Sequence, residues 1–357
     1  MTDETPAFES ATDTPPTRND GNDIHAKVRF LSSAAAYGST THVEVIETHM
    51  SWVFLTTQSA YKLKKPVKYA FLDFSTPAAR AFDCREEIRL NAHLAPGVYE
   101  DVVPLSYCDG SFRLGAYGKV VDWLVKMRRL PATEMMDILI LDNRITHRDV
   151  EKVAAILSRF YRHAEPVEIR DSDYIAHFSA EHSENCKILP MSRYGLPAET
   201  VQKLLAKVGD TIADKRHLLT DRIRAGAIVE GHGDLRPEHI CMTDPPVIFD
   251  CLEFNRVFRL IDPFDELAFL ALECERLGAG WIGPVLFRQV DGIHGETPDG
   301  ELIDFYTSFR ALLRARLALA HLLDPHPRTP ERWVPLAREY IDIAAKALLK
   351  PAIPATR

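Results

Sequence analysis

Two acidic residues and a histidine lie close together in one short segment of the chain. Residues 230–255 read EGHGDLRPEHICMTDPPVIFDCLEFN, in which Asp234 and Asp250 flank an expected hairpin and His239 lies between them. This order can bring two carboxylates and an imidazole to one metal–phosphate centre. Phosphoryl transfer needs divalent metal on the phosphate oxygens, nearby cations and one carboxylate that orients the nucleophile. The segment therefore indicates phosphoryl-transfer chemistry, with turn capping by the two Asp residues as the structural alternative.

The sequence before this segment predicts a small lobe built around a sheet. Runs rich in β-branched and aromatic residues predict strands at 43–55, 60–67, 102–114 and 119–127. The first two runs flank the polar tip Thr56-Thr57-Gln58-Ser59 and predict a hairpin, and the third run folds at Asp109-Gly110. Residues 76–94 begin with Thr and Pro and carry apolar side chains at helical intervals, which predicts a helix. A shorter helix is expected over 26–37.

The sequence after Pro131 predicts a larger, mainly helical lobe. Thr146 and Asp149 have the spacing of a capping box for a helix that ends near residue 164. Its apolar face is expected to comprise Val150, Val153, Ala154, Leu157 and Tyr161. Further expected elements are an amphipathic stretch at 198–224, short strands near 240 and 247–250, and almost continuous helix over 263–349. The predicted layout is a disordered tail at 1–24, an N-terminal nucleotide-binding lobe at 25–130 and a C-terminal catalytic and substrate lobe at 131–357.

Several motifs together carry a family resemblance. His232-Gly233-Asp234-Leu235 resembles the catalytic loop of the aminoglycoside phosphotransferases and choline kinases, which are relatives of the protein kinases. Ile248-Phe249-Asp250 resembles the strand that ends in that group's metal-binding Asp, and residues 262–268 resemble its DP-x-x-DLA stretch with an extra Glu266. The matching N-terminal motifs are Ser59-Ala60-Tyr61-Lys62 for the third-strand lysine, Glu87 for its partner and Val125–Pro131 for the connector between lobes.

These motifs follow the family's order over roughly residues 40–275, and ordered matches are far more specific than any one short motif. The chain is similar to a bacterial subgroup of unassigned substrate, some members of which carry an additional P-loop kinase domain. No GxxxxGK[ST] motif occurs here, so we expect no such domain in this chain. The resemblance implies an α+β, two-lobed protein-kinase-like fold with a small β-rich N-lobe and a large helical C-lobe.

The resemblance also implies roles for residues of the C-terminal lobe. Asp234 would align the acceptor hydroxyl and accept its proton, and Arg236 would offset the charge of the transferring phosphate. Asp250 would bind Mg²⁺, with His239 at the position where the family usually has Asn. Imidazole is a poor ligand for Mg²⁺, so Mn²⁺ is the alternative metal.

In the N-terminal lobe the resemblance implies nucleotide-binding residues. Lys62, tied to Glu87, would contact the α- and β-phosphates of ATP, Ala60 would lie under the adenine, and Met127 and Arg128 belong to the connector. Lys64 competes with Lys62 because period-two alternation places both on one strand face. On the expected helix, Glu86 is the alternative to Glu87 as the partner of the lysine. The hairpin tip lacks glycine, which makes a close backbone cradle over the phosphates less certain.

Other polar residues have structural or site interpretations. His232 is expected to hydrogen-bond within the loop, and Asp265 is expected to anchor the backbone of the catalytic loop from the following helix. Arg310, Arg314 and Arg316 lie on a mostly apolar helical stripe and are candidates for lining an acceptor pocket.

The composition limits the class of protein. A formal net charge of −8 argues against a general nucleic-acid binder, because the phosphate backbone attracts basic surfaces. Six scattered cysteines without a CxxC pair indicate reduced thiols, and no run approaches the roughly 18 apolar residues that cross a bilayer. We therefore expect a cytoplasmic protein without nucleic-acid or membrane partners. The sequence does not determine its oligomeric state.

The leading hypothesis is an ATP-dependent kinase that transfers the γ-phosphate to a hydroxyl of a small molecule, with ATP and Mg²⁺ or Mn²⁺ as cofactors. The second is a nucleotide-binding pseudokinase with a regulatory role, suggested by His239. The third is a metal-dependent hydrolase with His232, Asp234 and His239 as ligands. This last hypothesis leaves Lys62, Glu87 and the DP-x-x-D stretch unexplained.

Overall fold

The computed structural model describes residues 21–38, 42–69, 71–290, 292–293, 297–323, 327 and 329–349. The chain forms two compact units, Met1–Arg85 with Tyr99–Arg129 and Glu86–Val98 with Leu130–Arg357. Most of the predicted tail at 1–24 lies outside the described residues. The roles predicted for the two lobes, and their boundaries, remain predictions.

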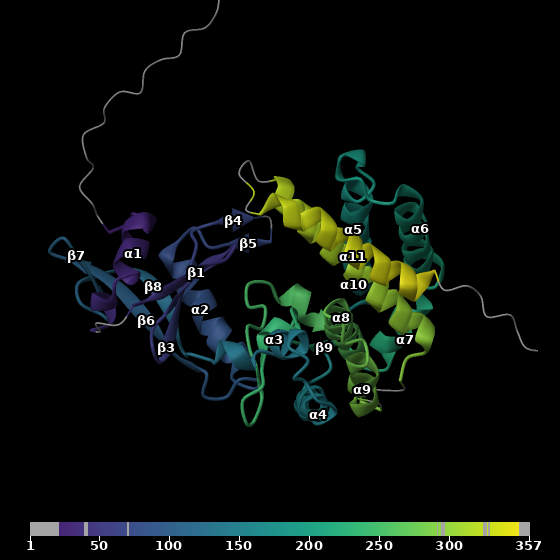
Figure 1. Ribbon diagram of the computed structural model, residues 1–357, viewed down its shortest axis with the longest axis horizontal. Helices are drawn as coiled ribbons and strands as arrows, with labels where there is room; N and C mark the ends of the chain where they lie inside the picture. Colours follow the sequence, from purple (N-terminus) through teal and green to yellow (C-terminus); the bar gives the residue numbers. More distant parts are fainter. Residues whose placement is uncertain are drawn as a thin grey trace, which may run out of the picture. The chain divides into compact units, whose positions relative to one another are not determined.

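The first unit is built on a six-stranded antiparallel sheet with strand order β1-β2-β3-β8-β6-β7 (Figure 1). Its strands are β1 (Glu44–Glu47), β2 (Ser51–Leu55), β3 (Ser59–Lys64), β6 (Tyr99–Cys108), β7 (Ser111–Leu114) and β8 (Lys119–Arg128). The smaller elements are α1 (Ile24–Leu31), the 3₁₀ turn η1 (Ala34–Tyr37), β4 (Lys68–Tyr69) and β5 (Leu72–Asp73). Helix α2 (Pro77–Asn91) begins in this unit and ends in the second.

The predicted β-hairpin at the start of the sheet is confirmed, with one difference. Strands β2 and β3 pair from Ser51↔Lys64 to Leu55↔Ala60. The expected single run at 43–55 is divided by a turn at 48–50, so that its first part forms β1 and pairs back onto β2. The turn at Asp109-Gly110 joins β6 to β7 as expected, with both residues at positive φ.

One face of this sheet packs on a small apolar core. The core residues are Leu31, Val43, Phe54, Leu63, Leu105, Val121 and Leu124. Elsewhere in the unit, Asp122 is fully buried and receives ion pairs from Lys27 and Arg80, each at 2.8 Å. A buried carboxylate is tolerated when cations and hydrogen bonds compensate its lost hydration, and this one ties α1 and α2 to β8.

The second unit is mainly helical. Its helices are α3 (Met136–Leu141), α4 (His147–His163), α5 (Asp171–Ile188), α6 (Ala198–Asp214), α7 (His217–Arg224), α8 (Pro263–Arg276), α9 (Ile282–Gln289), α10 (Gly300–Ala320) and α11 (Pro330–Leu348). Its short strands are β9 (Val229–Glu230), β10 (Ile240–Cys241), β11 (Val247–Ile248) and β12 (Leu260–Ile261). Its 3₁₀ turns are η2 (Ala132–Glu134), η3 (Ser192–Tyr194), η4 (Pro237–His239), η5 (Arg256–Arg259) and η6 (His321–Leu323).

Local sequence signals explain how several of these helices begin. The capping box of α4 is present as predicted, with Thr146 and Asp149 bonded to each other's backbone N–H groups, and its five expected apolar residues are buried. Asp262 caps α8 by accepting a hydrogen bond from the Phe264 N–H, and Pro263 occupies the first turn, where its missing N–H costs nothing. Asp262 also binds Arg222 at 2.6 Å, which fastens α7 to the start of α8.

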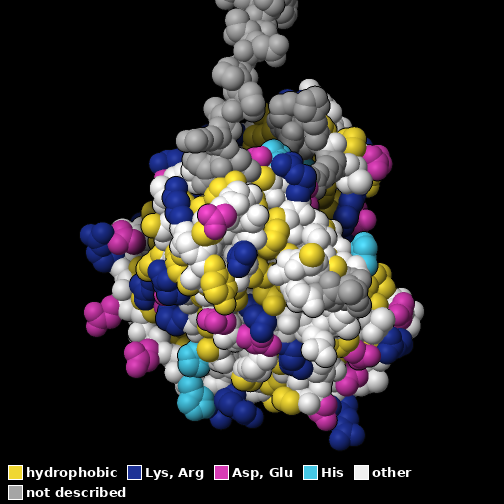
Figure 2. Space-filling model, turned by 90° about the vertical axis from the view of Figure 1, so that its left-hand side faces the viewer, with side chains coloured by type: hydrophobic (Ala, Val, Ile, Leu, Met, Phe, Trp, Pro, Cys, Tyr) yellow, Lys and Arg dark blue, Asp and Glu magenta, His cyan; other side chains and the backbone are white. Residues whose placement is uncertain are grey.

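The remaining helical predictions hold in part. The amphipathic stretch at 198–224 consists of two helices, α6 and α7, separated at Lys215 and Arg216. Helix α5 was not predicted. In the described parts of the chain no helix is both long and apolar enough to cross a membrane. On the face drawn in Figure 2, the described basic and acidic side chains are interspersed among hydrophobic ones.

Candidate active site

The candidate catalytic loop runs from Gly231 to His239 and connects β9 to η4. Two glycines are required by its geometry. Gly233 has φ +85°, and an added Cβ would lie 3.0 Å from the Arg259 side chain. At Gly231 a Cβ would lie 2.6 Å from Ile261 and 2.8 Å from a Glu266 oxygen. Gly233 is therefore required mainly by its positive φ and Gly231 by the close packing at its Cα, so the G-H-G-D spacing reflects the path of the loop.

A buried carboxylate on α8 fixes the backbone of this loop. Glu266 accepts hydrogen bonds from the His232 N–H at 3.1 Å and from the Gly233 N–H at 2.6 Å. The prediction that Asp265 anchors the loop is therefore wrong. Asp265 instead binds the guanidinium of Arg310 through two 2.7 Å hydrogen bonds, so the neighbouring Glu266 has the anchoring position.

His232 has the hydrogen-bonding role expected for it. The residue is fully buried, its Nε2 lies 2.8 Å from the Phe249 carbonyl oxygen and its Nδ1 accepts from the Asp234 N–H at 3.3 Å. Burial lowers the pKa of His232, which favours the neutral ring. Both ring nitrogens are thus used within the protein.

Asp234 is held by the side chain of Arg236. An Arg236 Nη2–H donates to Asp234 at 3.0 Å, and Nη1–H donates to Glu238 at 2.7 Å. Burial by itself would raise the pKa of Asp234, but the positive charge of Arg236, with smaller effects from His239 and Arg314, lowers it below the usual carboxyl value. The side chain of Asp234 is 31% exposed. It is therefore an ionised, accessible carboxylate at neutral pH.

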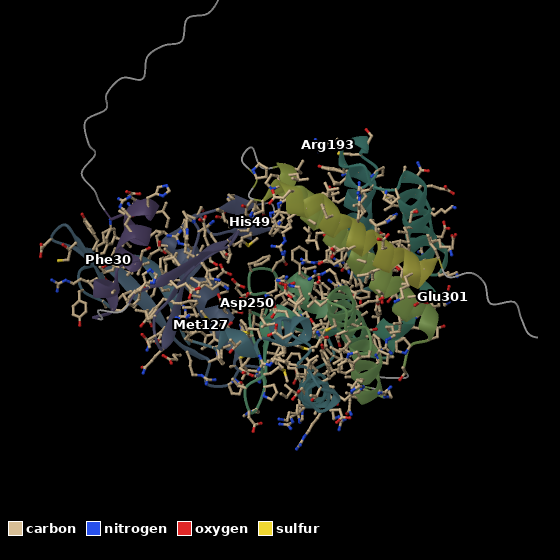
Figure 3. The ribbon with its side chains drawn as sticks, in the orientation of Figure 1. Phe30, His49, Met127, Arg193, Asp250 and Glu301 are labelled. Atoms are coloured by element: carbon tan, nitrogen blue, oxygen red, sulfur yellow. The ribbon has the colours of Figure 1, made fainter. Side chains whose placement is uncertain are left out.

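His239 lies beside Asp234, Arg236 and Asp250. His239 Nδ1 is 2.8 Å from the Asp234 carbonyl oxygen, which assigns the proton to Nδ1 and leaves Nε2 as an acceptor. Nε2 lies 3.7 Å from an Asp250 carboxylate oxygen and accepts from Arg236 at 3.1 Å. Asp250 follows β11 at φ +63°, an uncommon conformation for a non-glycine residue, and is labelled in Figure 3.

This pair fits a metal that takes its other ligands from water and phosphate. A metal-binding histidine usually donates its second N–H to a carbonyl or carboxylate, as His239 does here. Within the described residues, no group of three or more His, Cys, Asp or Glu side chains is placed to hold a metal ion by itself. Mg²⁺ typically binds through one or two carboxylates plus substrate phosphates. Asp250 matches this pattern, whereas His239 would suit a metal that accepts a nitrogen ligand.

A cluster on α8, α10 and α11 adjoins the catalytic loop. Glu273 is fully buried and binds Arg314 and Arg276, each at 2.9 Å, and the Tyr340 hydroxyl at 2.7 Å. Of the three arginines expected as candidates for an acceptor pocket, Arg314 is the one whose charge affects Asp234. Arg310 binds Asp265, and Arg316 binds Glu181 and Asn185 on α5.

Several of these residues were missed by the sequence analysis. They are Glu238, Glu273, Arg276 and Tyr340. A fifth is Asp137 on α3, whose buried Oδ1 has no hydrogen-bond partner among the described residues. Asp137 lies close enough to Glu238 and His239 for their charges to affect its pKa, which burial raises. In the sequence they are single charged or aromatic positions with no pattern that marks them.

In the first unit, three of the predicted nucleotide-binding residues share one face of the sheet. Ala60 pairs with Met127 across β3 and β8, and Lys62 pairs with Val125. Directly paired residues project to the same side, so Ala60, Lys62 and Met127 lie together; Met127 is labelled in Figure 3. Arg128 is exposed and, by strand alternation, points its side chain to the opposite face.

The alternatives to Lys62 and Glu87 differ in their surroundings. Lys62 is half-buried, whereas Lys64 is almost completely buried and its Nζ lies 5.1 Å from the centre of the Phe74 ring. On α2, Glu86 binds Arg89 at 2.8 Å on the surface, and Glu87 is fully buried. Lys62 and Glu87 belong to different units, and their pairing remains a prediction.

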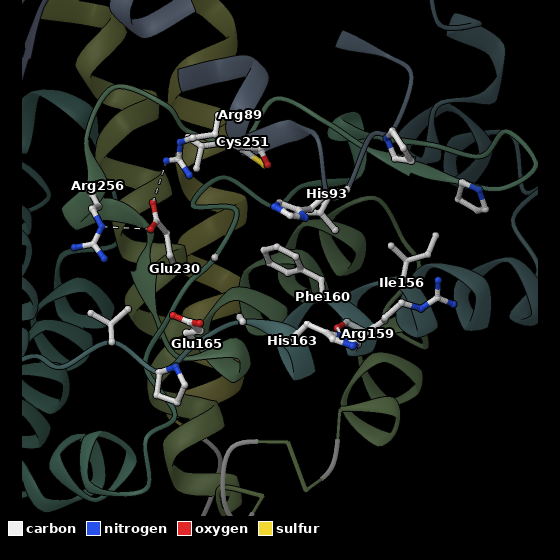
Figure 4. A pocket seen from close by; sticks show the side chains of 18 of the residues that line it. Arg89, His93, Ile156, Arg159, Phe160, His163, Glu165, Glu230, Cys251 and Arg256 are labelled. Carbon is white, nitrogen blue, oxygen red and sulfur yellow. Dashed lines mark hydrogen bonds and ion pairs between the residues drawn. The ribbon is translucent and has the colours of Figure 1, made fainter. Parts of the chain in front are cut away.

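A cavity of about 990 Å³ lies in the second unit (Figure 4). Its walls include Arg89, His93, Arg159, Phe160, Glu230 and Cys251. Gly231 and Cys251 border it from the catalytic loop and from the residue after Asp250, but neither Asp234 nor Asp250 lines it. We call it the separate cavity, because it adjoins the catalytic loop at Gly231 but contains neither of these two carboxylates.

The β-rich first unit, the helical second unit and the loop carrying Asp234 define a two-lobed protein-kinase-like fold, as predicted. A crystal structure of a choline/ethanolamine kinase family protein from Mesorhizobium loti matches 92% of this chain and 95% of its own, with a TM-score of 0.53 and 14% identity. The predicted resemblance is thus confirmed at the level of fold. A choline kinase from Cryptosporidium parvum matches 86% of this chain and 88% of its own, with a TM-score of 0.49 and 10% identity.

Sequence comparison adds relatives without a known activity. No protein-family model matches the chain. Uncharacterized proteins of Mycobacterium tuberculosis and Mycobacterium bovis are each 28% identical over 278 residues, which is 77% of this chain and 54% of theirs. The chain thus spans about half the length of the curated relatives it matches.

Proposed function

We propose that the protein is an ATP-dependent phosphotransferase that acts on a hydroxyl group of a small molecule. The observation that carries this proposal is the accessible, ionised Asp234 on a loop fixed by Glu266, in contact with Arg236 and next to the His239–Asp250 pair. In the reaction the acceptor oxygen would bond to the γ-phosphorus, the bond from that phosphorus to the leaving ADP oxygen would break, and the hydroxyl proton would pass to Asp234.

The other predicted groups have matching tasks. Asp250 and His239 would hold a divalent cation, which neutralises charge on the phosphate oxygens. Ala60, Lys62 and Met127 would contact ATP from the first unit, and we propose membership of the aminoglycoside phosphotransferase and choline kinase group on the ordered motifs and the shared fold. Choline is named only for proteins of similar structure, so it does not identify the acceptor of this one.

The test is a screen for ATP consumption with a mixture of cellular metabolites, in which products are identified by mass spectrometry. A compound that gains one phosphoryl group only when protein, ATP and Mg²⁺ or Mn²⁺ are all present supports the proposal. Absence of any phosphorylated product with either metal, from protein that binds ATP, would exclude it and favour a nucleotide-binding pseudokinase.

The metal preference offers a sharper prediction. His239 supplies an imidazole nitrogen where an amide oxygen is usual, and Mn²⁺ accepts nitrogen ligands more readily than Mg²⁺. We expect Mn²⁺ to support several-fold higher turnover than Mg²⁺ in the wild-type protein and His239→Asn to reverse this order. The measurement is the initial rate of ADP release over a range of Mn²⁺ concentrations and over the same range of Mg²⁺ concentrations.

The control for this prediction is His93→Asn, a change at an exposed histidine of the separate cavity, which should leave the ratio of the two metals unchanged. If His239→Asn leaves that ratio unchanged as well, His239 is not a metal ligand. The hydrolase hypothesis is disfavoured because His232 is fully buried and both its ring nitrogens bond to backbone groups. His239 would need to release only the Arg236 Nη2–H to present its Nε2 to a metal.

A further inference from the structure

The cluster beside the catalytic loop contains two arginines held in fixed positions. Arg276 on α8 and Arg314 on α10 both bind the buried carboxylate of Glu273. Their guanidinium carbons lie 5.8 Å and 5.6 Å from the centre of the Tyr340 ring, whose hydroxyl donates to Glu273. Burial raises the pKa of Tyr340 to about 12, so it remains a donor at neutral pH. We call Arg276 and Arg314 the arginine pair.

Among the described residues, Glu273 is the carboxylate that bonds to both arginines of the pair. The more distant carboxylates of Glu238 and Asp234 raise the pKa values of Arg276 and Arg314, respectively. The second acidic partner of Arg276 is Glu339, which is 3.8 Å away and 54% exposed, so water screens most of its charge. The two arginine side chains keep 19% and 21% of their surface exposed and can therefore still contact a ligand.

The arginine pair is also close to the reacting group. Helix α8, which carries Glu273 and Arg276, packs against η4 at the end of the catalytic loop. In agreement with this packing, the charge of Arg314 lowers the pKa values of Asp234 and Glu238. The His239–Asp250 pair is the candidate metal site, whereas the arginine pair belongs to the C-terminal helices, where an acceptor would bind.

We propose that the acceptor is an anionic hydroxylated small molecule whose carboxylate or phosphate group binds to Arg314 and Arg276 while its hydroxyl lies at Asp234. This inference rests on the proposed function and specifies its substrate class. Guanidinium groups bind carboxylate and phosphate through paired, charge-assisted hydrogen bonds. A cationic acceptor would be repelled by the same groups, whose positions are fixed by Glu273 and Tyr340.

The closing experiment separates metabolites by charge before the assay. Cellular metabolites are divided by ion exchange into anionic, neutral and cationic fractions, and each is incubated with the protein and γ-³²P-ATP. We expect labelled product from the anionic fraction. Labelling only from the neutral or cationic fraction would overturn the anionic acceptor and leave the phosphotransferase in place, whereas no labelling from any fraction would refute the proposed function itself. Pretreatment with alkaline phosphatase, removed before assay, abolishes labelling if the anion is a phosphate ester and spares it if the anion is a carboxylate.

Variants then test the arginine pair with the acceptor so identified. Arg314→Gln is expected to raise the KM for the acceptor by about 10- to 100-fold, the range for loss of a hydrogen bond between charged groups, and to leave the KM for ATP within about twofold. Arg314→Lys should restore part of the loss. The control is Arg159→Gln, an exposed arginine of the separate cavity, which should change neither constant. Equal effects of Arg314→Gln on both KM values, or none on the acceptor, would assign the cluster a purely structural role, and thermal unfolding identifies a misfolded variant.

Discussion

Replacement of Asp234 by Asn is expected to lower kcat for phosphoryl transfer by about 10²- to 10⁴-fold, the contribution typical of a positioned acid or base. The amide cannot accept the hydroxyl proton, and it loses the charge that holds Arg236 at 3.0 Å. ATP affinity and thermal stability should remain close to wild type, because Asp234 is partly exposed and the loop is fixed through the backbone by Glu266. The measurements are ADP release with the identified acceptor, nucleotide binding by fluorescence, and thermal unfolding.

The matched control for this prediction is Glu238→Gln. Glu238 is on the same loop, is also bound to Arg236 and has a side chain of similar exposure, 35% against 31%. It has no predicted contact with the acceptor hydroxyl, and we expect its replacement to lower kcat by no more than about tenfold, through the altered position of Arg236. Comparable losses in the two variants would show that charge around Arg236, rather than the carboxylate of Asp234, controls the rate.

The parts of the site that could be predicted are those that are local in sequence. Asp234, His239 and Asp250 occur in one short segment, and the capping box of α4 is four consecutive residues. The two glycines around His232 were visible as a motif, although their reason, the close approach of Ile261 and Arg259, appears only in three dimensions. The alternation of strand residues predicted a common face for Lys62 and Lys64 and could not choose between them.

The parts that could not be predicted depend on how helices are rotated and which helices meet. Adjacent helical residues point about 100° apart, so the orientation of α8 decides that Glu266, and not Asp265, reaches the loop. The cluster of Glu273, Arg314 and Tyr340 comes from three helices that are far apart in sequence. Each of its members looks like an ordinary charged or aromatic helix residue, and only packing brings them together.

Replacement of Glu266 by Ala is expected to lower the free energy of unfolding by roughly 3 kcal/mol or more and to reduce turnover strongly. One carboxylate oxygen accepts from the Tyr161 hydroxyl at 2.7 Å and from the His232 N–H, and the other accepts from the Gly233 N–H. The side chain is 1% exposed, so its removal deletes the acceptor of three hydrogen bonds in a buried site, and each such loss costs about 1–3 kcal/mol. The backbone that aims Asp234 would then lose its support. Urea unfolding and ADP release measure the two effects.

Two graded variants separate loop support from general stability. Glu266→Gln keeps one carbonyl oxygen and should lose about one of the three hydrogen bonds, at roughly 1–2 kcal/mol, with an intermediate loss of turnover. Tyr161→Phe removes only the hydroxyl contact, leaves both loop hydrogen bonds in place, and should cost about 1 kcal/mol while turnover stays near wild type. If Tyr161→Phe reduced turnover as much as Glu266→Gln at similar stability, the bonds to His232 and Gly233 would not be what positions Asp234. We therefore expect turnover to fall in the order Tyr161→Phe, Glu266→Gln, Glu266→Ala. This order would show that the buried Glu266 carboxylate positions Asp234 through the His232 and Gly233 N–H groups.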